Sequence, residues 1–390
     1  IGDLNNDGIN DIGMCDSRNN RLYIHFADST GFPRNASADV VIGLGASDAN
    51  RLVNIDTGNF MSALTSVAFC SSFAVLPDMN GDGQFDLAVG ESCDTSTTQA
   101  VCSTVVIIFM KNDGSGHPIN GRRIAGPAYM KSYGTQLTVV NGVTHPAYPT
   151  AAMLLSAFPL ADPSAAGGLV ASFISRTDGS LLHRYNITKE SDTIFDSLVV
   201  AADKFGVSIN NLGDIDGDGV DDLICAAPTA SKAPASSYLV VMFLNATGGV
   251  RALGTKTTVL SQSPRNANTY FMSSMKNIGD VDGDGVPEVV VGCKRVYHRH
   301  LVVLCLEWST WFSNCRFSSP SAESATFVHT VTSSTNGLSL PSGGGGRVAM
   351  YSVTATGVIT ASTAGPFWSG VSLYGQGATW PATALASNGT

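Results

Sequence analysis

Long apolar runs and helical periodicity are both missing from this chain of 390 residues. The most apolar stretches, VVIIFM from Val105 and LVVMFL from Leu239, are strand-sized, whereas a membrane-spanning helix needs about 18 residues or more. No segment sustains the 3.6-residue apolar period of an amphipathic helix. These absences exclude a helical bundle and a membrane-spanning helix within this sequence.

Charge is scarce, and familiar catalytic patterns are absent. Charged residues make up 14% of the chain, and acidic residues outnumber basic ones by 31 to 22. The net charge of -9 argues against a nucleic-acid partner held through its phosphates. The sequence has no G-x-S-x-G elbow, no G-x-x-x-x-G-K-[ST] phosphate loop and no H-E-x-x-H zinc helix. These features favour a protein that is not an enzyme and does not bind nucleic acid.

Glycine and hydrophobic residues are abundant, with 41 glycines and 44% hydrophobic residues. Such a composition is typical of short strands joined by turns. The sequence begins without Met or a signal peptide, and inside a motif, which indicates a mature fragment of a longer precursor.

An acidic ten-residue pattern occurs four times. The copies are GDLNNDGIND from Gly2, PDMNGDGQFD from Pro77, GDIDGDGVDD from Gly213 and GDVDGDGVPE from Gly279. Counted from its first Asp, each copy has acidic or amide residues at positions one, three and five, glycine at position six, and Asp or Glu at position nine. Each copy runs directly into a short apolar segment.

The spacing within these loops predicts calcium ligands. Alternate side chains of a tight loop can point to one centre, position seven can offer its backbone carbonyl, and glycine at position six permits the sharp turn. Asp, Asn and Gly also form plain turns without a metal, but four copies of one acid spacing would leave mutually repelling carboxylates without a cation. Oxygen-only ligation from a flexible loop suits calcium, which gives about four sites. The predicted ligands are Asp3, Asn5, Asp7, Ile9, Asp11; Asp78, Asn80, Asp82, Gln84, Asp86; Asp214, Asp216, Asp218, Val220, Asp222; Asp280, Asp282, Asp284, Val286 and Glu288.

The loops are part of a longer repeat. Their first Asp residues stand at positions 3, 78, 214 and 280, and the gap of 136 between the second and third is about twice the others. Repeats without a loop are therefore expected from Ser132 and from Gly345. Units of this length with several short strands indicate the four-stranded blades of a β-propeller. The approximate repeat units in a single domain, residues 1–390, are 1–65, 66–130, 131–200, 201–266, 267–340 and 341–390.

The segment KFGVSINNLGDIDGDGVDDLICAAP, residues 204–228, resembles an FG-GAP repeat, the unit of the integrin alpha-subunit propeller. Phe205-Gly206 matches the first half of that motif, and Ala226-Ala227-Pro228 matches the second. Other units depart from it, since Cys70 and Met272 stand where the glycine is expected. The resemblance implies a calcium-stabilised propeller, usually with seven blades. The expected fold is therefore all-β, a β-propeller of six or seven four-stranded blades.

Cysteines and sequons point to an oxidising compartment. Cys93 with Cys102 and Cys305 with Cys315 lie close in sequence across polar turns, which suits two local disulfides. The pairing of Cys15, Cys70, Cys225 and Cys293 is left open, and buried free thiols at Cys225 and Cys293 are equally consistent with their apolar strand positions. Asn-x-Ser/Thr glycosylation sequons occur at Asn35, Asn186, Asn245 and Asn388.

These features favour a secreted or cell-surface module for adhesion, matrix or surface assembly, which binds an extracellular protein or glycan. A carbohydrate-active enzyme or lectin on the same scaffold is one alternative. A self-associating subunit of an extracellular filament is another. The choice among them depends on analogy between folds, since propellers host many functions.

Overall fold

The structure is a computed structural model in which nearly all described elements are strands. It describes residues 1–44, 50–64, 67–93, 103–127, 132–159, 166–189, 191–200, 203–227, 238–258, 269–280, 284–295, 302–305, 326–329, 346–361 and 368–371. The chain divides into two compact units, the first formed by residues 1–260 with 355–358, and the second by residues 261–354 with 359–390. Each unit is described by itself.

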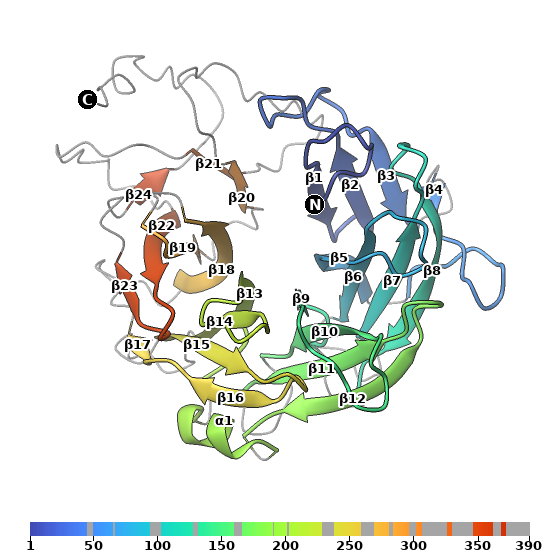
Figure 1. The fold of residues 1–390 in the computed structure, drawn as a ribbon. Coiled ribbons are helices and arrows are strands. Elements are labelled where there is room, and N and C mark those ends of the chain that lie inside the picture. The colour runs from blue at the N-terminus through green and yellow to red at the C-terminus, as the bar shows by residue number, and fades with distance from the viewer. Residues whose placement is uncertain are drawn as a thin grey trace, which may run out of the picture. The chain divides into compact units, whose positions relative to one another are not determined.

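The first unit contains four blade-like sheets (Figure 1). Their strands are β1 (Ile12–Asp16), β2 (Arg21–His25), β3 (Val40–Gly43), β4 (Asn50–Arg51); β5 (Val67–Leu76), β6 (Asp86–Cys93), β7 (Thr104–Met110), β8 (Pro118–Ala125); β9 (Gln136–Val140), β10 (Ala152–Ala157), β11 (Leu169–Ile174), β12 (Leu181–Ile187); β13 (Ser208–Gly213), β14 (Asp222–Ala227), β15 (Tyr238–Leu244), β16 (Val250–Leu253) and β17 (Thr257–Thr258). Neighbouring strands are antiparallel, except that β4 runs parallel to β3. We call these sheets blades one to four.

Successive blades of this unit pack face to face. The first strands of blades two, three and four, β5, β9 and β13, contact one another and lie innermost (Figure 1). Separate apolar clusters join blades one and two, blades two and three, and blades three and four. The middle strand β7 is buried along its whole length, because blades one and three cover its two faces, and β15 is likewise buried along its whole length. That packing explains why these strands are continuous apolar runs and do not alternate.

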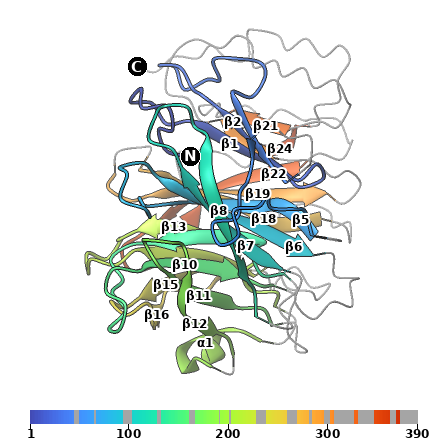
Figure 2. The ribbon, with the colours of Figure 1, turned by 90° about the vertical axis from the view of Figure 1, so that its right-hand side faces the viewer.

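One helix occurs among the described residues, α1 (Thr193–Leu198), which contacts β16 at the edge of the unit (Figure 2). It begins where the Asp192 carboxylate accepts hydrogen bonds from the backbone amides of Ile194 and Phe195, at 3.0 and 2.9 Å. No helix of the described residues is long and apolar enough to cross a membrane.

The second unit contains one large sheet. Its strands are β18 (Thr269–Gly279), β19 (Glu288–Arg295), β22 (Gly346–Val353), β23 (Ile359–Ala361) and β24 (Trp368–Val371). A separate parallel pair is formed by β20 (Val302–Cys305) and β21 (Thr326–His329).

The described residues thus form an all-β propeller-type structure with five blades, and the expectation of six or seven is wrong. The segment from Gly345 was expected to begin a sixth unit, 341–390. Its strand β22 instead pairs directly with β19 and takes the third place in the fifth sheet. The strand that follows β19 in the chain, β20, pairs with β21.

The two halves of the FG-GAP pattern form contacts within and between blades. In blade four, the Gly206 amide donates to the Ala226 carbonyl at 3.0 Å. Between blades two and three, the Gly134 carbonyl packs against Gly90, where an added Cβ would lie 1.8 Å from the oxygen. The Ser72 hydroxyl donates to the same carbonyl at 2.8 Å. Residues 133–134 therefore take the FG place in a blade without an acidic loop, as the repeat spacing predicts.

The structure answers part of the question of which cysteines pair. Cys15 on β1 and Cys70 on β5 form a disulfide that joins blades one and two. Cys225 is a buried free thiol on β14. The predicted pairs Cys93–Cys102 and Cys305–Cys315 stay predictions, because Cys102, Cys315 and the side chains of their partners lie outside the described residues.

Candidate metal centre

Each acidic loop enters a sheet at the same kind of place. The loops at 77–86, 213–222 and 279–288 connect the first and second strands of their sheets, and the loop at 2–11 leads directly into β1. We call them loops one to four in chain order. Loops one to three belong to the first compact unit and loop four to the second.

In each loop, the carboxylate at position one accepts backbone hydrogen bonds, and the loop folds around that carboxylate. In loop three, Asp214 accepts hydrogen bonds from the amides of Asp218 at 3.0 Å and Gly219 at 2.8 Å. The same two bonds form at Asp3, Asp78 and Asp280. The glycine at position six has a φ between 84° and 90° in all four loops, in the left-handed region that favours glycine. Each loop is therefore a preformed turn folded around its position-one carboxylate.

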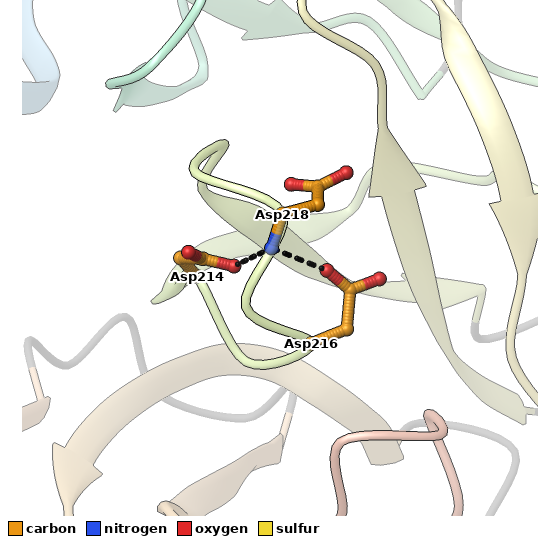
Figure 3. Close-up of side chains that lie close together, drawn as sticks. All are labelled: Asp214, Asp216 and Asp218. Atoms are coloured by element: carbon orange, nitrogen blue, oxygen red, sulfur yellow. Dashed lines mark hydrogen bonds between the residues drawn. The ribbon is translucent and has the colours of Figure 1, made fainter.

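Loop three brings three carboxylates to one place (Figure 3). One ligand oxygen from each of Asp214, Asp216 and Asp218 lies within 4.8 Å of the other two. The Asp218 amide is hydrogen-bonded to both other side chains, which fixes all three on one turn (Figure 3). The sequence prediction that alternate residues converge is confirmed for this loop.

The carboxylate at position nine has a second role that the spacing alone does not reveal. Asp86 is fully buried and accepts from the amide of Met79 in its own loop, at 2.7 Å. It also accepts from the amide of Met110 at the end of β7, at 2.8 Å. Asp11 makes the same pair of bonds with the amides of Leu4 and Ala27. Position nine therefore ties the loop to the end of the second strand that follows it, β7 in blade two and β2 in blade one.

These buried carboxylates are short of positive charge. Burial raises the pKa of Asp86 to about 7, against the lowering effect of its two amide donors, and the carboxylates of Asp78 and Asp82 raise it further. Burial likewise raises the pKa of Asp222 to about 7, and its Oδ1 atom is buried without a hydrogen bond of normal geometry. A divalent cation among these oxygens would offset both the burial and the mutual repulsion. The residues of loops two and three fit such an ion.

The sequence prediction missed two arginines whose side chains contact loops one and three. The Arg34 guanidinium pairs with Asp7 in loop one. The Arg251 guanidinium, on β16, pairs with Asp216 and lies 3.3 Å from Asp218 Oδ2 in loop three. Each arginine lies seven residues after the residue whose backbone amide faces position nine, Ala27 or Leu244. That shared spacing is a signal that the sequence contains.

The remaining predicted ligands occupy varied settings. Position three is Asn in loops one and two, and Asn5 accepts from the Asp7 amide at 3.1 Å, as Asn80 does from Asp82. At position seven the side chains of Gln84 and Val220 are buried. In loop four, Asp282 lies outside the described residues, whereas Asp280, Asp284, Val286 and the buried Glu288 are described.

The glycosylation sequons have different surroundings. Asn35 donates to Asp39 at 2.6 Å, and Asn186 lies on the edge strand β12. The Asn245 side-chain oxygen accepts from the amides of Thr247 and Gly249 within a hairpin. Asn388 lies outside the described residues.

Comparison with known proteins supports the resemblance found in the sequence. The family model described as FG-GAP repeat matches residues 205–242, which include loop three and most of the two strands that follow it. The chain is 33% identical to integrin alpha-IIb of Homo sapiens over 89 residues, or 23% of this chain and 8% of that protein. It is 32% identical to integrin alpha-5 of Xenopus laevis over 89 residues, with the same coverage. The similarity to FG-GAP repeats is confirmed, and the match spans only 8% of the length of these relatives.

Among solved structures, the rhamnogalacturonan lyase YesW aligns with 69% of this chain and 47% of its own. The TM-score of that alignment is 0.31 and the sequence identity 15%. A similarity at this level supports no conclusion about function.

Proposed function

We propose that this chain is a calcium-stabilised propeller module that acts outside the cell by binding a protein or glycan partner. The observation that carries the proposal is the convergence of Asp214, Asp216 and Asp218 within 4.8 Å, inside the segment that matches an FG-GAP repeat. The similarity to two integrin alpha subunits supports the same kind of role.

The proposed calcium ligands are positions one, three, five, seven and nine of each loop. A bound ion would supply positive charge that neutralises the clustered carboxylates. In this chain, the position-one Asp folds the loop, and the position-nine carboxylate links it to the end of β7 in blade two and to the strand before Ala27 in blade one. The role of the ion is therefore structural.

A non-catalytic, extracellular role is supported by separate features. The sequence contains no familiar catalytic motif, and the described loop carboxylates accept hydrogen bonds from backbone amides that fold the turn. The Cys15–Cys70 disulfide is typical of an oxidising compartment. The sequons at Asn35, Asn186 and Asn245 are proposed glycosylation sites on the same grounds.

Removal of calcium is expected to lower the melting temperature strongly. At ten times the dissociation constant, each occupied site contributes about 1.4 kcal/mol, so the three loops of the first unit contribute about 4 kcal/mol. For a unit of this size that stabilisation corresponds to a shift of about 10 °C. Calorimetry in calcium and in EGTA measures it.

The triple variant D214N/D216N/D218N is the control, because asparagine keeps the hydrogen-bond acceptors of loop three while removing its charge. We expect the variant to lose about one third of the calcium-dependent shift. Identical melting curves of the wild-type protein in calcium and in EGTA would contradict the proposal.

The nature of the partner is tested separately. Glycan-array binding that requires calcium would favour a lectin, and release of shortened glycans would favour a carbohydrate-active enzyme. Concentration-dependent assembly in sedimentation velocity would favour a filament subunit. Binding to extracellular proteins, without glycan binding, glycan cleavage or assembly, would favour the adhesion or matrix role.

A further inference from the structure

Three hairpins lie beside loops one, two and three. We call residues 28–34, 111–119 and 245–251 the return hairpins. Each follows a residue whose backbone amide faces the position-nine carboxylate of its loop, and these residues are Ala27, Met110 and Leu244. These three residues pair with Pro33, Pro118 and Val250, so the hairpin of blade two is two residues longer than the other two. The last residues of the three hairpins, one after each of these partners, are therefore equivalent in register.

The last residue of the return hairpin differs among the three loops. It is arginine in blades one and four, Arg34 and Arg251, and isoleucine in blade two, Ile119. Both arginines pair with loop carboxylates, Arg34 with Asp7 and Arg251 with Asp216. Ile119 is exposed and carries no charge.

In loop two, the side-chain amide of Asn112 contacts the loop, as the side chain of an arginine does in loops one and three. The Asn112 side chain donates to the backbone carbonyl of Asp82 at 2.5 Å and accepts from Asn6 of loop one at 3.0 Å. Within the part of the chain that the structure describes, no lysine or arginine pairs with Asp78 or Asp82. Loop two thus has no fixed positive charge on its proposed ligands.

A guanidinium on the ligands opposes a divalent ion in two ways. In the ion-free loop it relieves the repulsion among the carboxylates, and in the ion-bound loop it repels the second cation. Arginine carries its charge at every physiological pH, whereas isoleucine carries none. The Arg251 side chain is 42% exposed, so the pair itself adds little to folding stability. Its main effect is then on ion affinity, which depends on the net charge of the ligands.

We propose that Arg34 and Arg251 weaken calcium binding at loops one and three, an effect that loop two, with Ile119 at the equivalent position, lacks. This inference rests on the proposed function, because it assumes that the loops bind calcium. The last residue of the return hairpin then tunes the calcium affinity of the loop beside it. Without their arginines, loops one and three would bind calcium more tightly.

The test is a calcium titration of the full chain against a chromophoric chelator at pH 8. R251M is expected to tighten one stepwise dissociation constant by about tenfold, because a full charge beside a divalent ion is removed. I119R, which puts arginine at the position that matches Arg251 in register, is expected to weaken one constant by a similar factor. The control is R184M, which removes an arginine whose hydrogen bond goes to the Ala125 carbonyl of blade two, and we expect it to change no constant.

A double variant assigns the effect to loop three. In D214N, which impairs that loop, adding R251M should no longer tighten any constant. If the wild-type protein binds calcium and neither R251M nor I119R changes any dissociation constant, the inference is overturned and the proposed function is not. Failure of the wild-type protein to bind calcium at all would overturn both.

Discussion

Replacement of Asp86 by alanine is expected to lower the free energy of unfolding by about 3–5 kcal/mol even in calcium-free buffer. The Asp86 carboxylate accepts from the amides of Met79 and Met110, at 2.7 and 2.8 Å, in a fully buried setting. Each buried amide left without an acceptor costs about 1–3 kcal/mol. Urea denaturation in EGTA, followed by circular dichroism, measures the loss.

D82A in the same loop is the matched control. Asp82 is partly exposed and accepts from the amide of Gln84 at 2.9 Å, so its loss without calcium is expected to be about 1 kcal/mol or less. Both variants should lose the stabilisation that calcium gives to loop two. Equal stability of D86A and D82A in EGTA would contradict the role assigned to position nine.

Replacement of Gly90 by alanine is expected to disrupt the junction of blades two and three, with a loss of at least about 3 kcal/mol. The added Cβ would lie 1.8 Å from the Gly134 carbonyl oxygen and 2.8 Å from its carbon. Both atoms belong to backbone, so no side-chain rotation can relieve the overlap. The fall in the midpoint of urea denaturation measures the effect.

G81A separates crowding from backbone strain. Gly81 has a φ of 80°, and an added Cβ would meet no atom within 4 Å. Its substitution should therefore cost about 1 kcal/mol through the left-handed conformation alone. A G90A variant as stable as G81A would show that the FG and GAP segments do not pack as described.

The repeat made much of the architecture predictable from the sequence. The four acidic loops marked a turn in four of the blades, and the doubled spacing between the second and third loops located the loop-less blade from Ser132. The convergence at Asp214, Asp216 and Asp218 followed from the period of alternate residues in one turn. Patterns of this kind involve residues that are close together in the sequence, so they can be recognised from the sequence alone.

The contacts that could not be predicted join residues far apart in the chain. Asp86 meets the amide of Met110, 24 residues away, and Arg251 meets Asp216, 35 residues away. The Cys15–Cys70 disulfide spans 55 residues and stayed one of several possible pairings. The predicted number of blades was wrong for a related reason. A strand such as β22 can complete one sheet or begin another without any change in its apolar pattern.

Backbone conformation also survives changes in residue type. Cys70 and Met272 stand where the FG motif has glycine, yet both have positive φ, at 62° and 63°. The structure therefore keeps the same turn in units whose sequence departs from the family pattern. Such positions weaken a motif search without changing the fold.

The most direct test of the account is the number of calcium ions bound by the intact chain. Equilibrium dialysis against calcium, followed by metal analysis of the dialysed protein, counts them. The account predicts saturable binding of about four ions, one for each acidic loop, and about three after the substitutions D214N, D216N and D218N together. Absence of saturable binding up to about 10 mM calcium, beyond the weakest range of extracellular modules, would contradict it.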